Sequence, residues 1–406
     1  MPYPPLVAPA EDLTPDQARR YVRQLTLPDV GPLGQRRLRA ARILVVGAGG
    51  LGSPVLLYLA AAGVGTLGIV DDDAVDVTNL HRQVVHGDAD LGRPKVDSAR
   101  DRVLASNPEV EVRSHRVRLT AANALDVIAG YDLVVDGTDN FATRYLVGDA
   151  CAILGTPVVW GSILRMDAQV SVFWAGQGPT YRDLFPVPPP PDAVPSCAEG
   201  GVLGAVCGVV GSVMATEAVK LVTGTGEPLV GRVLVLDAAE MTWRTVRVRR
   251  NPDLPPVTTL TDLDQAYCSV ASGPPAVTVT PAAGAGQRAG ATEVTATEVT
   301  ATELARMLAA RERGEDDFVL VDVREPFERD IVAIPGSVAL PLDRFRSGEA
   351  LTDLPAERRV VLHCKSGRRS AEALSVLHAA GRSDAVHLAG GILAWVADVE
   401  PGKPVY

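Results

Sequence analysis

Glycines and an acidic residue with the spacing of a phosphate-binding site lie in the first fifth of the chain. The run Gly47-Ala-Gly49-Gly50-Leu-Gly52 follows an apolar segment and precedes a helical pattern, and Asp71 ends the next apolar segment. Glycine lets the backbone approach a phosphate, the helix N-terminus supplies N–H donors, and an acid at the second strand end suits a ribose hydroxyl. The pattern predicts a nucleotide site, and by itself it suits a nicotinamide-dependent oxidoreductase equally well.

Charged residues downstream of this pattern favour phosphoryl or nucleotidyl transfer. Arg82 and Lys95 follow Asp71, and Asp139 and Asn140 follow a third apolar segment. Nicotinamide binding does not require cations at these positions. Phosphoryl or nucleotidyl transfer does, because cations stabilise the charge that develops on the phosphates. A carboxylate such as Asp139 can hold Mg²⁺ near an α-phosphate. Each cation alone would be expected to be solvated surface charge. Together with Asp139 they predict a nucleotidyl-transfer site.

A cysteine loop near the C-terminus has the composition of a sulfur-transfer site. Cys364 follows an expected strand and precedes an expected helix. Loop N–H groups, the helix N-terminus and adjacent cations favour the thiolate, and the same donors could hold a persulfide anion or an oxyanion. Four residues separate Cys364 from Arg369, which favours sulfur over the longer Cys-x5-Arg loops that suit phosphate. The predicted persulfide loop comprises Cys364, Lys365, Ser366, Gly367, Arg368 and Arg369.

The apolar pattern predicts a strand before, and a helix after, both the glycine loop and the cysteine loop. Alternation of short apolar strands with helices is typical of α/β proteins with a mostly parallel, doubly wound sheet. A second, smaller α/β domain is predicted near the C-terminus, where Thr300 and Glu303 fit a capping box. The expected strands are 42–47, 66–71, 132–136, 157–160, 232–237, 318–323, 360–363 and 385–388, and the expected helices include 16–25, 53–62 and 370–379.

Shifts in composition divide the chain into segments. Residues 1–17 are rich in proline and predict a flexible tail, and residues 18–252 predict the nucleotide-binding domain. Residues 253–291 are rich in Pro, Ala, Gly and Thr with little periodicity, which is typical of a linker. Residues 292–406 predict the second domain, beginning in a short repeat of Thr-Glu-Val-Thr-Ala.

Composition and charge narrow the possible classes of function. The net charge of −10 is unlike the basic footprint of a nucleic-acid-binding protein. The apolar stretch 202–215 is shorter than the roughly 20 residues of a membrane span, and the N-terminus has no signal-peptide pattern. An odd number of cysteines in a long chain predicts no disulfide framework, with Cys151 and Cys207 as core residues and no role assigned to Cys268. We therefore expect a cytoplasmic protein without membrane or nucleic-acid partners.

The nucleotide-binding domain resembles the ubiquitin-activating-enzyme superfamily from about residue 19 to residue 251. The resemblance rests on Arg20-Tyr-Val-Arg23-Gln24, the glycine run, Thr78-Asn79-Leu-His-Arg82-Gln83, Gly92-Arg-Pro-Lys95 and Thr138-Asp139-Asn140. More closely, it resembles the bacterial branch of that superfamily, the adenylyltransferases of molybdopterin synthase (MoeB type) and of the thiamine pathway. It implies ATP contacts, with Mg²⁺, at Gly47, Gly49, Gly50, Asp71, Thr78, Asn79, Leu80, His81, Arg82, Lys95, Asp139 and Asn140.

The same resemblance implies a reaction and a quaternary structure. A C-terminal glycine carboxylate of a small carrier protein would attack the α-phosphorus of ATP, giving an acyl adenylate and pyrophosphate. Arg23 matches an arginine that reaches into the partner subunit's site, which implies a homodimer. Cys197 matches a family cysteine proposed to link covalently to the carrier or to a persulfide. Whether Cys197 is functional or merely an exposed thiol stays open on the sequence.

One departure from the family concerns a structural metal. Most members bind zinc through two Cys-x-x-Cys pairs, but here those positions are Thr180-Tyr-Arg-Asp183 and Leu254-Pro-Pro-Val257. A closed structural zinc site needs about four such ligands, so no zinc is expected. The same loss is typical of the actinobacterial adenylyltransferase/sulfurtransferases of the MoeZ type, the group that the chain resembles most.

The second domain resembles the rhodanese family of sulfurtransferases. Val321-Asp322-Val-Arg324-Glu325, Ile334-Pro-Gly336 and Gly390-Gly-Ile-Leu-Ala-Trp395 carry the resemblance, which implies that Asp322 and Arg324 are structural. The two resemblances together imply adenylation of ubiquitin-like sulfur carriers that end in Gly-Gly (MoaD, ThiS or CysO type), followed by thiocarboxylate formation from a Cys364 persulfide. Thiosulfate or a cysteine desulfurase would supply the sulfur. The alternatives are a non-catalytic scaffold that docks carriers and, less favoured, the nicotinamide oxidoreductase.

Overall fold

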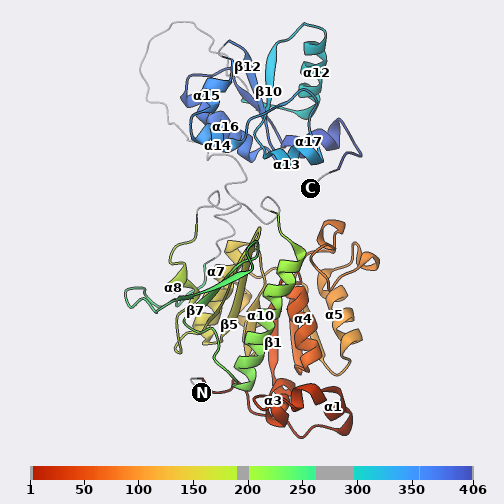
Figure 1. The fold of residues 1–406 in the computed structure, drawn as a ribbon, viewed down its shortest axis with the longest axis vertical. Coiled ribbons are helices and arrows are strands. Elements are labelled where there is room, and N and C mark those ends of the chain that lie inside the picture. The colour runs from red at the N-terminus through yellow and green to blue at the C-terminus, as the bar shows by residue number, and fades with distance from the viewer. Residues whose placement is uncertain (1–2, 190–200, 262–296, 356, 405–406) are drawn as a thin grey trace, which may run out of the picture. The chain divides into compact units, whose positions relative to one another are not determined.

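The computed structural model describes residues 3–189, 201–261, 297–355 and 357–404 (Figure 1). The chain divides into two compact units, Met1–Thr278 and Val279–Tyr406. Cys197, Cys268 and most of the predicted linker lie outside the described residues.

The first unit is built on an eight-stranded sheet in the order β3-β2-β1-β4-β5-β6-β7-β8. The five strands from β3 to β5 are parallel, and the last three pairings are antiparallel. This arrangement confirms the mostly parallel, doubly wound fold. The strands are β1 (Arg42–Val46), β2 (Thr66–Val70), β3 (Glu111–His115), β4 (Leu133–Asp136), β5 (Val158–Leu164), β6 (Asp167–Phe173), β7 (Arg232–Asp237) and β8 (Thr242–Arg247).

Helices cover both faces of this sheet because its central strands are apolar on both sides. In β1, Ile43 and Val45 belong to one core and Leu44 and Val46 to the other, as alternation along a strand requires. The first core contains α4 (Gly52–Ala62), α5 (Lys95–Ser106) and α10 (Gly204–Thr223), and the second contains α6 (Ala124–Ile128) and α7 (Phe141–Leu154).

The order of the strands creates a switch point between β1 and β4. These strands are parallel neighbours, but β1 continues into α4 on one face of the sheet and β4 continues into α7 on the other. Ligands of open α/β sheets bind outside the carboxyl ends of the strands at such a point. The fold therefore directs attention to the loops that follow β1 and β4.

One helix in the described parts of the chain, α10, is long and apolar enough to cross a membrane. It has 20 residues and continues beyond the apolar stretch 202–215 as far as Thr223. Eleven of its residues, Glu217 among them, are buried in the first unit. A core helix has the same length and composition, so α10 is weak evidence for a span.

The N-terminal segment differs from the expected flexible tail and single helix. Leu6 N–H donates to Leu221 of α10 at 3.2 Å, and Ala10 N–H donates to Arg36 at 3.0 Å, so this segment is hydrogen-bonded to the domain. The helical pattern of 16–25 is interrupted at buried Tyr21. The helices here are α1 (Pro15–Arg20), α2 (Val22–Leu25) and α3 (Gly31–Ala40).

The second unit is a five-stranded, all-parallel sheet in the order β11-β10-β12-β13-β9. The strands are β9 (Glu298–Val299), β10 (Phe318–Asp322), β11 (Val338–Ala339), β12 (Arg359–His363) and β13 (Val386–Leu388). One face packs against α14 (Leu342–Arg346), α15 (Ala350–Asp353) and α16 (Arg368–Ala379), and the other against α12 (Ala301–Glu312) and α17 (Gly391–Asp398). The predicted capping box is confirmed at the start of α12, where Thr300 is the N-cap.

Candidate functional sites

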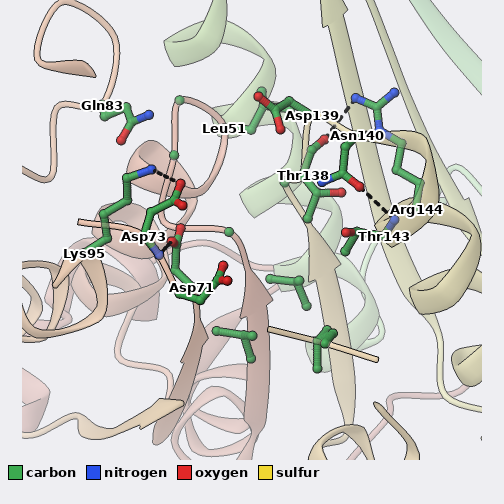
Figure 2. Close-up of a pocket in the computed structure, with 18 of the residues that line it drawn as sticks. Leu51, Asp71, Asp73, Gln83, Lys95, Thr138, Asp139, Asn140, Thr143 and Arg144 are labelled. Atoms are coloured by element: carbon green, nitrogen blue, oxygen red, sulfur yellow. Dashed lines mark hydrogen bonds and ion pairs between the residues drawn. The ribbon is translucent and has the colours of Figure 1, made fainter. Parts of the chain in front are cut away.

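A cavity of about 330 Å³ lies at the switch point of the first unit. The loops after β1, β2 and β4 form its walls, and Figure 2 shows side chains from the loop after β2 and from α5 facing those from the β4–α7 segment. The sequence-predicted residues that line it are Gly47, Gly49, Gly50, Asp71, Arg82, Lys95, Asp139 and Asn140.

The glycine loop is closed too tightly for side chains at two of its positions. Gly47 has φ +90°, a conformation that favours glycine, and a Cβ on Gly52 would lie 1.8 Å from the carbonyl oxygen of Gly47. The loop is tied to the first turn of α4 by Ser53, whose N–H donates to Gly49 at 2.9 Å. Bare backbone at Gly49 and Gly50 therefore forms one wall of the cavity, where a phosphate can approach it.

The acid wall joins β2 to the glycine loop and to α5. Asp71 accepts hydrogen bonds from the N–H groups of Ala48 and Asp73, both at 2.9 Å. Lys95 Nζ lies 2.7 Å from the Asp73 carboxylate (Figure 2). Burial raises the pKa of Asp71, and the nearby Lys95 partly offsets that rise. This wall thus holds one cation, Lys95, beside the carboxylates of Asp71 and Asp73. Such a set suits a ligand that carries both phosphates and hydroxyl groups.

The opposite wall is a turn built on a buried carboxylate. Asp136, at the end of β4, accepts from the N–H (3.0 Å) and hydroxyl (2.7 Å) of Thr138, and burial raises its pKa. This turn presents Asp139 exposed at the cavity. Asn140 is the N-cap of α7 and accepts from the N–H of Thr143 at 2.8 Å (Figure 2).

Four of the residues implied as nucleotide contacts do not line the cavity. Thr78, Asn79, Leu80 and His81 lie in or just after a short 3-10 helix, Val77–Asn79, beside it. Two of them hold the side chain of Arg82, whose guanidinium donates to Thr78 O at 2.9 Å and contacts the ring of His81 at 2.9 Å. Burial, then the neighbouring Arg82, lowers the pKa of His81.

Arg23 lies far from the cavity of its own chain. It is exposed on α2, and its neighbour Gln24 donates to the carbonyl of Ala62, at the C-terminal end of α4. The glycine loop precedes the other end of this eleven-residue helix, about 16 Å away at 1.5 Å per residue. Within one chain, the structure does not bring Arg23 together with the other predicted site residues.

Among the cavity residues that were missed as candidates are Gln83, Arg144 and Cys207. Gln83 is 4% exposed, and its Oε1 has no hydrogen-bond partner. Arg144 donates twice to the carbonyl of Thr138, at 2.9 and 3.2 Å. Cys207 of α10, expected in the core, is buried but also lines the cavity, where a Cβ on Gly50 would lie 3.0 Å from its sulfur. Adjacency to the predicted motifs could have identified Gln83 and Arg144, whereas no local signal identifies Cys207.

The cysteine loop of the second unit encloses a single sulfur atom. Cys364 is 1% exposed, and its Sγ accepts a hydrogen bond from Gly367 N–H at 3.2 Å. Gly367 has φ +97° and is the N-cap of α16, so Arg368 and Arg369 belong to the first helical turn. Arg369 forms a two-bond ion pair with the buried carboxylate of Glu328, with both distances 2.7 Å, which fixes this guanidinium beside the loop.

The N-terminus of α17 also forms hydrogen bonds with this loop. Ile392 and Leu393 of α17 donate N–H groups to the carbonyls of Cys364 (2.8 Å) and Lys365 (3.1 Å). A Cβ on Gly391 would lie 2.5 Å from both carbonyl oxygens, which explains the glycine at the first position of α17. Asp322 and Arg324 form a fully buried ion pair at 2.7 Å.

The segments where relatives would carry zinc ligands are joined by a carboxylate. Asp183 accepts from the N–H of Thr180 and from the N–H of Asn251, each at 2.7 Å. Its position corresponds to the second residue of the missing first pair, and Asn251 lies just before the missing second pair. Tyr181 is buried here among Tyr145, Trp160, Phe173 and Phe185.

Comparison with known proteins gives matches over nearly the whole chain. A model of the ThiF family matches residues 21–256, and a model of the rhodanese-like domain matches residues 300–398. The probable adenylyltransferase/sulfurtransferase MoeZ of Mycobacterium tuberculosis is 52% identical over 407 residues, covering 99% of each chain. The sulfur carrier protein adenylyltransferase of Thermus thermophilus is 55% identical over 247 residues, covering 60% of this chain and 91% of that one. The adenylyltransferase and sulfurtransferase MOCS3 of Drosophila ananassae is 38% identical over 97% of this chain and 86% of its own length.

Solved structures share the fold at lower identity. A crystal structure of E. coli MccB with MccA-N7isoASN matches with a TM-score of 0.54 and 21% identity, covering 59% of this chain and 75% of that one. A crystal structure of PaaA matches with a TM-score of 0.51 and 23% identity, covering 60% and 76% respectively. At these identities the likeness concerns the fold alone.

Proposed function

Because the chain belongs to the ThiF family and ends in a rhodanese-like domain, we propose that it adenylates the C-terminal glycine carboxylate of a ubiquitin-like sulfur carrier protein and then loads that carrier with sulfur. The observation that carries the first activity is the cavity at the switch point, with bare glycine backbone on one wall and cations and carboxylates on the others. These transferase relatives leave the oxidoreductase hypothesis without support.

In the adenylation step, the cavity residues bind and orient ATP for attack by the carrier carboxylate. Asp71 receives a ribose hydroxyl, the glycine loop receives phosphate oxygens, and Arg82 and Lys95 stabilise charge that develops on the phosphates. The exposed carboxylate of Asp139 supplies the oxygen donor that Mg²⁺ prefers. A bound Mg²⁺ would neutralise phosphate charge, and the glycine backbone and the side chains named above make the other contributions.

In the sulfur step, Cys364 carries the transferable sulfur as a persulfide. The terminal sulfur attacks the acyl carbon of the adenylate, AMP leaves, and an acyl disulfide joins the carrier to Cys364. Attack by the Cys197 thiolate on the Cys364 sulfur would then release the thiocarboxylate and leave a Cys197–Cys364 disulfide, which a dithiol reductant reopens. Cys197 is thereby given a role from the family resemblance alone.

The sulfur donor, the carriers, the quaternary structure and the absence of zinc are proposed by extension from the relatives. Thiosulfate or a cysteine desulfurase supplies the persulfide sulfur, and carriers ending in Gly-Gly serve molybdenum cofactor, thiamine or cysteine synthesis in the cytoplasm. The position of Arg23, remote from its own cavity, supports a homodimer in which it completes the partner's site. Asp183 joins the first segment that lacks zinc-binding cysteines to Asn251, just before the second such segment, which supports folding without zinc.

The decisive experiment measures the intact mass of a Gly-Gly-ended carrier after incubation with the protein, MgATP and thiosulfate. We expect replacement of one carrier oxygen by sulfur. The Cys364→Ala variant should stop at the adenylate, because the adenylation cavity does not include that residue. If the wild-type protein produces neither adenylate nor thiocarboxylate with any carrier, the catalytic proposal is wrong and the carrier-docking scaffold becomes the better hypothesis.

A further inference from the structure

A line of polar side chains runs inward from the surface of the second unit to the sulfur of Cys364. Ser370 Oγ lies 3.5 Å from Cys364 Sγ and 3.3 Å from His387 Nδ1. On the other side of the ring, His387 Nε2 lies 3.1 Å from the Glu298 carboxylate. Cys364, Ser370 and His387 are buried, and Glu298 is exposed.

These contacts join three segments that are distant in the sequence, since Cys364 and Ser370 belong to one strand–loop–helix segment. Glu298 lies on β9, His387 on β13, Ser370 in the first turn of α16, and Cys364 follows β12. The pairing of β13 with β9 places His387 beside Glu298. The serine, the histidine and the acid have no part in the reaction sequence described above.

We propose that Ser370, His387 and Glu298 form a proton relay that takes up the thiol proton of Cys364 when this residue accepts sulfur. The thiol proton passes to Ser370 Oγ, the serine proton passes to His387 Nδ1, and the Glu298 carboxylate accepts the hydrogen bond from Nε2–H of the imidazolium. The Cys364 thiolate then attacks the outer sulfur of thiosulfate, and sulfite leaves with the electron pair of the broken S–S bond. The proposal rests on the proposed role of Cys364 as the persulfide carrier.

The surroundings of His387 suit a proton acceptor. Burial lowers the pKa of His387, so the ring is neutral at pH 7, and the Glu298 charge partly offsets this effect and stabilises the imidazolium. Of the elements beside the ring, β12 places the apolar Leu362 opposite His387, and α16 contributes the hydroxyl of Ser370. Glu298 is therefore the charge that acts on the imidazole.

The Ser370 hydroxyl has three hydrogen-bond partners within reach. Its single proton can be donated to the Gly367 carbonyl at 2.9 Å, to the ring nitrogen of His387 at 3.3 Å or to the sulfur of Cys364 at 3.5 Å. When it is donated to His387, the lone pairs of Ser370 Oγ are free to accept the thiol proton. Ser370 and His387 thus act through Cys364 and are positioning residues rather than groups that touch the carrier.

The test measures alkylation of Cys364 in the full-length protein by iodoacetamide, following the Cys364 peptide by mass spectrometry from pH 5.5 to 9.5. We expect His387→Gln to move the pH–rate profile about one unit to higher pH, which slows alkylation at pH 7 about tenfold. Ser370→Ala should do the same, and the double variant should be no slower than either single variant because both break one relay. Glu298→Gln should have a smaller effect, because this carboxylate is exposed to solvent.

The control variant is His378→Gln. His378 lies on the same helix as Ser370, but its Nε2 contacts the carbonyl of Ala385 at 3.0 Å rather than the relay. Its profile should match the wild type, and an unchanged thermal midpoint of the second unit should confirm that every variant folds. A wild-type profile for His387→Gln, or additive effects in the double variant, would overturn the relay while leaving Cys364 as the sulfur carrier. Thiocarboxylate formation by Cys364→Ala would instead overturn the underlying function.

Discussion

Two loops in this molecule join the carboxyl end of a buried parallel strand to a helix, and they create sites of opposite kinds. The glycine loop between β1 and α4 has no reactive side chain, and it borders a cavity to which other strands and helices contribute charged groups. The cysteine loop between β12 and α16 encloses one sulfur atom that is 1% exposed. Chemistry on a large bound nucleotide needs room and distributed charge, whereas sulfur carried on the protein needs only a ring of donors around it.

The largest effect should follow from removing a cation of the cavity. Lys95→Met keeps much of the side-chain volume but removes the charge that lies beside Asp73. Carrier-dependent ATP–pyrophosphate exchange should fall about 10²- to 10³-fold, the usual loss for one electrostatic contact to a transition state. Thiosulfate–cyanide sulfur transfer, which needs only the cysteine loop, should be unchanged. Lys403→Met is the charge control, and equal losses in both assays would mean that the two loops do not work separately.

The next effect concerns the cysteine loop alone. Gly391→Ala places a Cβ 2.5 Å from two loop carbonyls at a residue with φ +59°, so the strain and the contact together should cost about 3 kcal/mol. Sulfur transfer should decrease and the thermal midpoint of the second unit should fall, with pyrophosphate exchange retained.

Gly314→Ala is the matched control for this variant. Gly314 has φ +74° in the same unit, but nothing lies within 4 Å of its Cβ position. It carries the backbone strain without the contact, so equal destabilisation of both variants would mean that the loop is not held by α17.

Acid should destabilise the second unit because unfolding allows the buried His363 to bind a proton. This side chain is 0% exposed in β12, and burial lowers its pKa to about 4, an effect that the nearby Asp322 partly offsets. The unfolded chain binds this proton near pH 6.5 and the folded chain only near pH 4, so stability is full above pH 6.5 and falls between these values. The loss due to this residue at pH 4.5 is about 2.5 kcal/mol. His363→Leu should show a shallower decline in thermal midpoint from pH 7 to 4.5, and an unchanged slope would contradict it.

The smallest effect should come from the Asp183 link in the first unit. Asp183→Asn weakens the bonds to Thr180 and Asn251 and should cost about 1.5 kcal/mol, the size of a hydrogen bond to a charged group. Denaturant unfolding measures this cost, and metal analysis of the same samples should find no stoichiometric zinc. Stoichiometric zinc in the wild-type protein would show that other residues replace the missing cysteines. The cysteine loop should be unaffected.

Contiguous residues made much of the fold predictable. The apolar runs of β1, β2, β4, β10 and β12 are buried strands because parallel sheets covered on both faces require continuous apolar sequence. Strands β3 and β8 were missed because their side chains are largely exposed and carry no apolar pattern. The short β9 lies in the Thr-Glu-Val-Thr-Ala repeat, where no strand was expected.

By itself, the sequence determined the two strand–loop–helix motifs, the capping box at Thr300 and the residues whose chemistry suits a nucleotide and a sulfur atom. These signals are local, since a loop and its flanking elements are contiguous in the chain. Only the tertiary structure decided that Gln83, Arg144 and Cys207 share one cavity, and that Thr78 lies beside it rather than within it. It alone brought Glu298 and His387 to Ser370, because contacts between segments nearly 90 residues apart depend on strand order and register, which no local pattern encodes.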